Sequence, residues 1–275
     1  MLRMLRSVGE TSNLSSINKN MQPYRITLAT ILPRKVWIIA ILCVLVLPMI
    51  LPYLTSYELN PSLIEPARAQ AAWICLWVVS LAWILFQAAR FGDDSARSGL
   101  GAYFLSAGIS RISQMFQLWC ACLTFLVPLV MVTVAVCLIG AMPSGEGQVQ
   151  IWIATNLQYA ALFLLVVAPL ALVAISVGSR FGATVGYLLP LSLGLYGIYG
   201  VGYLAMMTSV QGNVVIEWLY VISPHYHLAD LTPRLVFKHG TMLTSEFLHL
   251  VAYFIGIKLV LSMLSTICFQ AKSAT

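Results

Sequence analysis

The stretch RFGDDSARSGLGAYFLSAGISRISQMFQL, residues 90–118, is a polar segment with several arginines and paired aspartates between two long apolar runs. Apolar runs of about 20 residues form helices that are long enough to cross the hydrocarbon core of a bilayer, which is about 30 Å thick. The stretch therefore marks a loop that leaves the bilayer between two membrane-spanning helices. It is the part of the chain best suited to contact a partner outside the membrane.

The composition extends this pattern to the whole chain. Of the 275 residues, 60% are hydrophobic and only 9% are charged, and the mean hydropathy is +0.89. Charged residues make up roughly 25% of an average soluble domain. The apolar runs are too long and too uniform for the alternating strands of a membrane barrel, so helices must satisfy the backbone inside the bilayer. The sequence therefore predicts an all-α, polytopic membrane protein.

We predict three parts, with the six membrane-spanning helices in the middle one. They are a tail with an interface helix at 1–35, a transmembrane domain at 36–268 and a second tail at 269–275. The spans are expected at residues 36–54, 70–89, 115–140, 152–177, 183–207 and 246–268.

Two local patterns refine this layout. Residues 21–34 mix apolar and polar side chains before a basic pair, which fits either a short amphipathic helix at the membrane surface or an irregular lead-in to the first span. Pro190 predicts a kink in the fifth span, since neighbouring helices or water are able to satisfy the carbonyl that it frees.

Basic residues set the expected orientation, because cytoplasmic loops of membrane proteins are enriched in Lys and Arg. With the N-terminus inside, 11 of the 15 basic residues lie in inner segments and 3 in outer segments, and Lys258 lies within the last span. Both termini and the loop at 90–114 are therefore expected in the cytoplasm. The segment 208–245 is then a long outer loop, whose apolar pieces predict short helices that fold back toward the membrane as a cap.

The sequence shows no recognisable catalytic or nucleotide-binding motif. It lacks the G-x-x-x-x-G-K-[ST] phosphate loop, the H-E-x-x-H zinc helix and a serine nucleophile elbow. Its basic residues are spread along the ends of the spans, which argues against nucleic-acid binding. The nine carboxylates, none of them near mid-membrane where coupled carriers bind their ion, are Glu10, Glu58, Glu65, Asp93, Asp94, Glu146, Glu217, Asp230 and Glu246. We therefore expect this chain to have no catalytic residue and to bind no cofactor.

Lys258 is the exception among the ionisable residues, because it lies near the middle of the last predicted span. A charged side chain there costs at least about 2.5 kcal/mol. Lys258 therefore either contacts an anionic substrate or another helix, or is satisfied by hydroxyls and carbonyls in a packed bundle. With Tyr196 and Tyr199 it forms our candidate transport path. The glycines around those tyrosines predict either close packing within the chain or a mobile, subunit-contacting helix.

His225 and His227 are the candidates for a metal site, because a His-x-His pair is able to place two imidazoles on one ion. No cysteine or methionine cluster joins them in the outer loop, and Pro224 beside them suits a turn. The six cysteines lie within or at the edge of apolar runs and are interpreted as small hydrophobic residues. We therefore predict no metal site and interpret the two histidines as solvated or interfacial.

The layout and the loop together resemble the type-2 ATP-binding cassette (ABC) export permeases. The loop residues DSARSGLGAYFLSAGISR, 94–111, match the family's pattern of an acidic and basic start, a glycine, an apolar patch and a Ser-Arg ending. Gly108 stands where the family commonly has proline, and no lysine follows before the third span. A second stretch, SPHYHLADLTPRLVF at 223–237, resembles the Pro-x-aromatic-x-x-x-Asp segment of the subgroup named for multicopper enzyme maturation.

This resemblance implies a permease subunit of an exporter in the bacterial plasma (inner) membrane, with a second permease copy or a paralogue beside it. ATP and Mg would bind in a separate ATPase subunit, into whose groove the family's loop docks. A chain with neither a nucleotide site nor a coupling carboxylate needs such a partner to drive transport. The expected docking residues, of which the four apolar ones would fill the groove, are Asp93, Asp94, Arg97, Leu100, Tyr103, Phe104, Ile109 and Arg111.

Other functions remain open on the sequence. The chain is alternatively an intramembrane enzyme or stand-alone carrier, or a membrane scaffold that transports nothing, and the loop is then a solvated linker with a surface helix. For an exporter, a lipid, a peptide and a maturation factor for an exported enzyme are all candidate substrates.

Overall fold

The structure, a computed structural model, describes residues 21–54, 64–143, 145–236 and 240–271. Within those ranges the chain forms helices and connecting loops and no strand. Six helical segments there are long and apolar enough to cross a membrane: Val36–Leu54, Ile64–Arg97, Arg111–Gly140, Gly147–Phe181, Ala183–Val210 and Thr244–Cys268. The prediction of an all-helical, multi-pass membrane protein is thus confirmed. The expected tail at 1–20 and the last four residues lie outside the described part.

The helices follow the predicted spans but are longer at several ends. The first half of the chain forms α2 (Gln22–Ile31), α3 (Val36–Ile50), α4 (Ile64–Val79), α5 (Leu85–Arg97), α6 (Leu100–Ser106) and α7 (Arg111–Ala135). The second half forms α8 (Glu146–Phe181), α9 (Ala183–Leu195), α10 (Val201–Gln211), α11 (Val214–Ile222), α12 (Thr232–Val236) and α13 (Thr244–Cys268). Shorter 3-10 or π turns are η1 (Leu32–Arg34), η2 (Leu51–Leu54), η5 (Ser80–Ile84), η6 (Val136–Gly140), η7 (Tyr196–Gly200) and η8 (Tyr226–Ala229).

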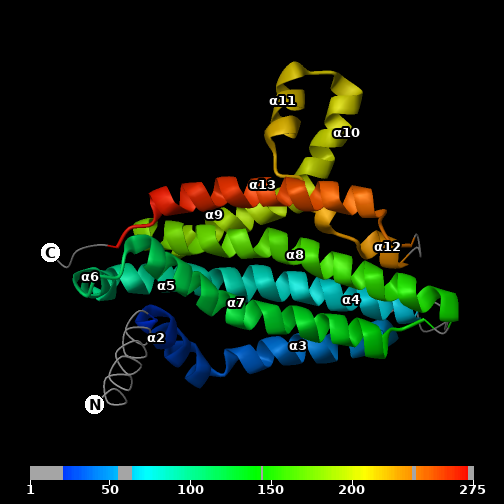
Figure 1. The fold of residues 1–275 in the computed structure, drawn as a ribbon. Coiled ribbons are helices and arrows are strands. Elements are labelled where there is room, and N and C mark those ends of the chain that lie inside the picture. Colours follow the sequence, from blue (N-terminus) through cyan, green and yellow to red (C-terminus); the bar gives the residue numbers. More distant parts are fainter. Residues whose placement is uncertain (1–20, 55–63, 144, 237–239, 272–275) are drawn as a thin grey trace, which may run out of the picture.

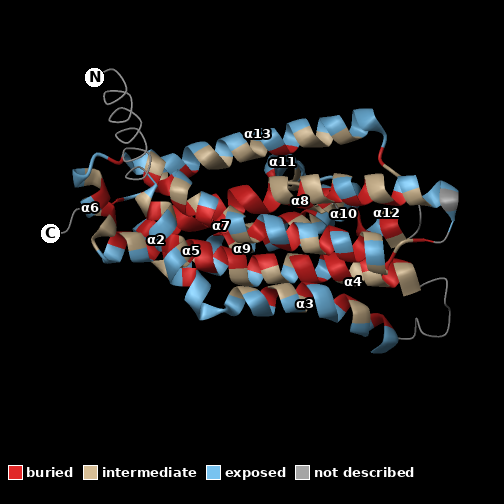
Figure 2. Cartoon of the chain, turned by 60° about the horizontal axis from the view of Figure 1, so that its bottom comes forward, coloured by how far each residue is buried: buried red, intermediate tan, exposed pale blue. Residues whose placement is uncertain are grey.

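Helix α8 forms the centre of the bundle, with α4–α5, α7, α9 and α13 packed around it (Figure 1). Of its most apolar stretch 83% is buried, compared with 6% for α13 and 22% for α3. Figure 2 shows α13 and α3 on opposite sides of the bundle, each with long exposed faces. Because the exposed residues of α13 are mostly apolar, this helix needs a cover other than water.

The two ends of the bundle differ in what they carry. Helices α2 and α6 and the end of α13 lie together at one end, whereas α12 lies at the other (Figure 1). Residues 21–34, for which the sequence allowed either a short amphipathic helix or an irregular lead-in, form the helix α2 and the turn η1, and α2 packs on α7. There Tyr24 Oη lies 3.1 Å from Thr124 Oγ1. The chain thus returns to the end from which it started, as an even number of spans requires.

The fifth span departs from the expected path. Helix α9 continues through Pro190, and the chain instead changes direction at the π turn η7, after which α10 leaves the bundle crosswise (Figure 1). The kink predicted at Pro190 is therefore replaced by a bend further along. The expected short helices of the outer segment are α11, η8 and α12.

Three glycines hold α5, α8 and α9 in close contact near the α6 end. A Cβ added to Gly92 would lie 2.0 Å from the carbonyl oxygen of Ile175, and one added to Gly178 would lie 2.3 Å from that of Ala89. A Cβ on Gly186 would lie 2.5 Å from Gly178 Cα. The backbones of three helices therefore touch directly, which only glycine permits and which is a common way for membrane helices to pack.

We expect Gly92→Ala to destabilise the protein, because its methyl group meets backbone that cannot rotate away. Overpacking of this kind costs at least about 1–3 kcal/mol, measured as a lower melting temperature in detergent. The control is Gly147→Ala in α8, where an added Cβ meets nothing within 4 Å. Equal melting temperatures for the two variants would contradict the close contact.

Candidate docking surface and buried polar sites

Two glycines with positive φ define the short helix α6 at the end of the bundle. Gly99 (φ 73°) separates it from α5, and Gly108 (φ 86°) ends it before α7 begins. The N–H of Ile109 then donates to the carbonyl of Phe104 over 2.9 Å. Because proline is confined to negative φ, the proline that the resembled family carries at this point would not fit here. Gly108 thus closes this turn in a backbone conformation that proline would not allow.

Gln114, which the sequence did not single out, fastens α6 to α7. Its side chain is 1% exposed, and Nε2 donates to the carbonyls of Gly101 over 3.2 Å and Ile109 over 3.0 Å. Phe104, with 3% exposure, and Ile109, with 6%, are buried beside it. A small cavity of about 70 Å³ separates this layer from α2. The underside of α6 therefore packs against its own chain.

The expected docking residues divide into an inner and an outer set. Phe104 and Ile109 were expected to fill a partner's groove, but both are buried within the chain and are not available to one. Tyr103 is 60% exposed, Asp94 and Arg111 are exposed, and Leu100 is half-buried. The exposed top of α6 is therefore a tyrosine flanked by two arginines and an aspartate.

Asp93 and Arg97 connect this surface to the next helix. Arg97 Nε lies 2.6 Å from Asp93 Oδ1; the arginine side chain is 75% exposed and the aspartate 12%. Because the arginine side chain is so exposed, this ion pair adds little to the stability of the fold. It has a positional role: a Cβ on Gly182, in the turn between α8 and α9, would lie 3.2 Å from the Arg97 guanidinium. The end of α5 thus lies directly against the start of α9.

We expect Gln114→Leu to loosen α6 without unfolding the bundle. Each lost hydrogen bond contributes about 0.5–1.5 kcal/mol, so amide hydrogen exchange in α6 should quicken roughly tenfold or more. Ser106→Ala is the control, because Ser106 bonds only within α6. If exchange in α6 were the same in both variants, Gln114 would not be what holds the helix.

Lys258 has an aromatic ring, and not a carboxylate, as its neighbour. Its ammonium is 5.7 Å from the ring centre of Trp119, and Trp119 is held by a 2.7 Å bond from its indole N–H to the Ala168 carbonyl. Such a cation–π contact offsets part of the cost of a charge in the membrane. Among the described residues no carboxylate forms an ion pair with Lys258.

The other candidate path residues have separate partners. Tyr196 Oη lies 2.6 Å from Ser223 Oγ, whereas Tyr199 is 73% exposed. Neither has a described contact with Lys258, so the structure does not join the three into one site. Tyr196 serves instead to hold the outer segment against the bend at η7.

A buried polar cluster, not found from the sequence, holds the outer segment on the bundle. Tyr159 Oη donates to Asp230 Oδ1 over 2.5 Å, accepts from Trp77 Nε1 over 3.1 Å and lies 3.0 Å from Thr232 Oγ1. The Trp73 ring stacks on Tyr159 with 3.8 Å between centroids. Asp230 of the SPHYHLAD motif thus has a structural role, which is to fasten its segment to α4 and α8.

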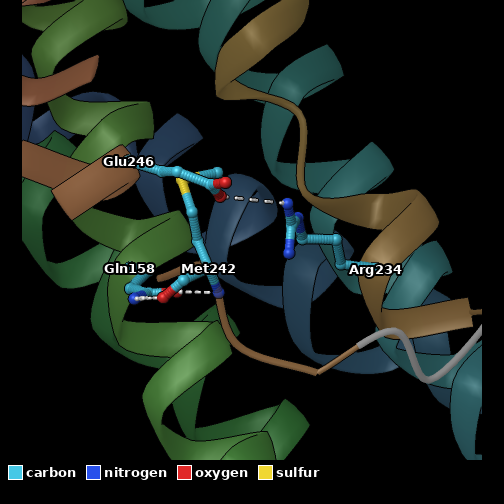
Figure 3. A network of polar contacts seen from close by, with 4 residues as sticks. All are labelled: Gln158, Arg234, Met242 and Glu246. Atoms are coloured by element: carbon cyan, nitrogen blue, oxygen red, sulfur yellow. Dashed lines mark hydrogen bonds and ion pairs between the residues drawn. The ribbon is translucent and has the colours of Figure 1, made fainter. Parts of the chain in front are cut away.

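A second tie lies beside α12 and is drawn in Figure 3. The side-chain amide of Gln158 both donates to the Met242 carbonyl and accepts from the Met242 N–H, each over 3.1 Å. Arg234 Nη2 lies 3.8 Å from Glu246 Oε2 at the start of α13. Together with the Tyr159 cluster, these contacts fix the outer segment to both α8 and α13.

We expect Tyr159→Phe to lower the melting temperature by several degrees. It leaves the Trp77 N–H and the Asp230 carboxylate short of a partner, and an unsatisfied buried group costs about 1–3 kcal/mol. Tyr199→Phe, at an exposed tyrosine, is the matched control and should be neutral. Equal melting temperatures would show that the cluster does not fasten the segment.

His225 and His227 lie together at the base of the α10–α11 hairpin. Their ring centroids are 5.7 Å apart, and His225 Nδ1 lies 3.0 Å from Tyr253 Oη. Burial, and then the neighbouring His225, lower the pKa of His227, against the opposing effect of a hydrogen bond with Gly197. Among the described residues, no three His, Cys, Asp or Glu side chains group as metal ligands would.

No family model, curated protein or solved structure matches this chain. Its function therefore has to be inferred from its own residues and contacts.

Proposed function

We propose that this chain is the membrane-spanning permease subunit of an ABC exporter, and that a separate ATPase subunit docks on α6 and the adjoining ends of α5 and α7. The observation that carries the proposal is the mounting of α6. This short helix lies outside the spans, is fastened from below by Gln114, and presents an exposed Tyr103 between charged residues. A rigid, exposed helix of this kind suits the transfer of force from another protein.

The distribution of charge supports a cytoplasmic position for this surface. At the α6 end, the described basic residues are Arg25, Arg34, Lys35, Arg90, Arg97, Arg111 and Arg180, whereas Arg68 and Arg234 lie at the opposite end. An excess of Lys and Arg marks the cytoplasmic side. We accordingly place α6 and both termini in the cytoplasm, in the plasma membrane of a bacterium.

The packing gives a route from the docking surface into the spans. Helix α5 continues from the second span to Arg97 without leaving helical structure, and Gly92 and Gly178 leave no space between α5 and α8. Arg97 also lies against the turn that begins α9. Movement of α6 would therefore shift α5 and α9 together, because closely packed helices move as rigid bodies.

This mechanism assigns different tasks to different chains. ATP and Mg belong to the ATPase subunit, whose closure on ATP would push on α6. This chain supplies the spans, and two permease copies, or this chain and a paralogue, would form the path between them. No catalytic residue is required of the permease, which is consistent with a chain that has no nucleotide-binding loop in its sequence.

We expect Tyr103→Asp and Arg111→Glu each to reduce co-purification of a phosphate-loop ATPase at least tenfold while leaving membrane insertion and melting temperature unchanged. Both side chains are exposed, and the described ring contact of Tyr103 is with Phe104 of the same short helix. The measurement is pull-down in mild detergent, with the ATPase identified by mass spectrometry and by ATP hydrolysis in the eluate.

The control matched to Arg111→Glu is Arg34→Glu, the same change of charge at an exposed arginine in η1, outside the proposed docking surface. It should keep the ATPase bound. Failure of any phosphate-loop ATPase to accompany the unmodified chain would overturn the proposal. An equal loss in the control would also overturn it, because the effect would then be one of general charge.

A further inference from the structure

The hairpin formed by α10 and α11 stands away from the rest of the molecule (Figure 1). Its tip turns at Gly212 (φ 55°), and Asn213 Oδ1 accepts from the Val215 N–H over 2.9 Å to begin α11. Its base is held at Ser223 by Tyr196 and at His225, whose N–H donates to Tyr253 Oη over 3.1 Å. The hairpin is therefore a formed element with a fixed base and an uncovered length.

The base of the hairpin lies within the depth of the spans. Tyr253 is nine residues into α13, about 14 Å from its outer end at 1.5 Å per residue. The hairpin leaves the bundle sideways at this level, beside α13, and does not continue past its end (Figure 1). Whatever covers the hairpin must therefore also lie beside α13, alongside the bundle.

Both the hairpin and α13 expose large apolar side chains. No described residue of α11 is buried. The exposed apolar residues of the hairpin are Tyr203, Met206, Val210, Val214, Val215, Trp218, Leu219, Val221 and Ile222. Those of α13 are Leu248, Tyr253, Ile255, Leu259, Val260, Met263, Leu264 and Ile267.

Lipid alone is a poor cover for the hairpin, because the hairpin also carries polar groups. Glu217 is exposed in the first turn of α11 and has no ion pair among the described residues. Ser209, Gly212 and Asn213 are exposed near the tip. A carboxylate without an ion-pair partner is costly in hydrocarbon, and exposed polar groups beside it add to that cost. A protein surface that offers a cation at the right depth satisfies both the apolar and the charged residues.

Lys258 of α13 offers that cation. It is half-buried on Trp119 and has no carboxylate partner among the described residues. It lies five residues beyond Tyr253 toward the α6 end, about 7.5 Å further along α13. Helix α11 is likewise on the α6 side of the hairpin (Figure 1). Glu217 and Lys258, neither of which has an ion-pair partner among the described residues, thus both lie toward the α6 end from the point where the hairpin joins the bundle.

We propose that the α10–α11 hairpin is an intersubunit arm that lies against α13 of a second copy of this chain, with Glu217 facing Lys258 of that copy. A twofold axis along the bundle keeps both copies at the same depth, so each arm meets the other copy's α13 and the contact forms twice. The inference rests on the proposed function for the pairing of two permeases. It adds the surface through which they pair.

Cross-linking between copies tests the contact directly. One tagged chain carries Glu217→Cys and a differently tagged chain carries Lys258→Cys, and both are co-expressed in full length and oxidised in the membrane. We expect a disulfide-linked species that contains both tags. Each variant paired with the unmodified chain measures the background cross-linking from the six native cysteines. Glu217→Cys paired with Phe181→Cys, at the C-terminal end of α8, should not exceed that background.

The charge contact is tested by dimerisation of the purified chain in lipid nanodiscs. Polar contacts between membrane helices are modest, so we expect Glu217→Gln to weaken the dimer about 3- to 20-fold. Glu65→Gln, at a half-buried glutamate in the first turn of α4 that has no ion pair among the described residues, should have no such effect. Glu217→Lys should weaken it further, and Glu217→Lys combined with Lys258→Glu should restore it.

The inference is overturned if the unmodified chain is monomeric in the bilayer, or if cross-linking at 217 and 258 does not exceed the Phe181 control. It is also overturned if the Glu217→Gln and Glu65→Gln variants dimerise equally. All of these measurements use the permease alone. A chain that pairs in this way but binds no ATPase would contradict the proposed function and support the arm. A chain that binds an ATPase but does not pair through the arm would contradict this inference and support the proposed function.

Discussion

The direct contact of helix backbones at Gly92, Gly178 and Gly186 is the constraint on which the arrangement of the bundle depends. Apolar side chains do not by themselves draw helices together in lipid, since the lipid is equally apolar, and close packing has to supply the attraction. With no Cβ between them, α5 and α9 lie tightly on α8. Helix α8 thereby becomes the buried centre, and the end of α5 that leads to α6 is held rigidly.

The proposed docking surface on α6 takes its rigidity from that contact. Helix α6 is short and has little stability of its own, so its shape depends on Gly99, Gly108 and the two bonds from Gln114. The outer segment is held in a comparable way by Tyr159 and its partners. Both ends of the molecule are thus irregular segments fixed to a close-packed bundle by buried polar groups, which are effective because they have no competing water.

Much of the fold could be predicted from the sequence, and less of the site. Long apolar runs predict spans wherever they occur, and the structure has the six helical segments that were expected. The exposure of the loop was only half predicted: Tyr103 and Phe104 are neighbours of similar character, yet one is 60% exposed and the other 3%. Which side of α6 faces the bundle depends on the turn at Gly108, and the positive φ of this residue cannot be predicted from composition. Likewise, the bond between Tyr159 and Asp230 joins residues 71 positions apart.

The sequence alone is enough to predict a helical membrane protein with six spans, a polar loop after the second and a helical segment before the last. The physical reason is that the bilayer imposes length and polarity on each span separately, so local composition suffices. The sequence did not predict that α8 is central, that the α6 surface consists of Tyr103 and its charged neighbours, or that α10 and α11 leave the bundle. Those features come from contacts between distant segments, whose partners no single stretch of sequence specifies.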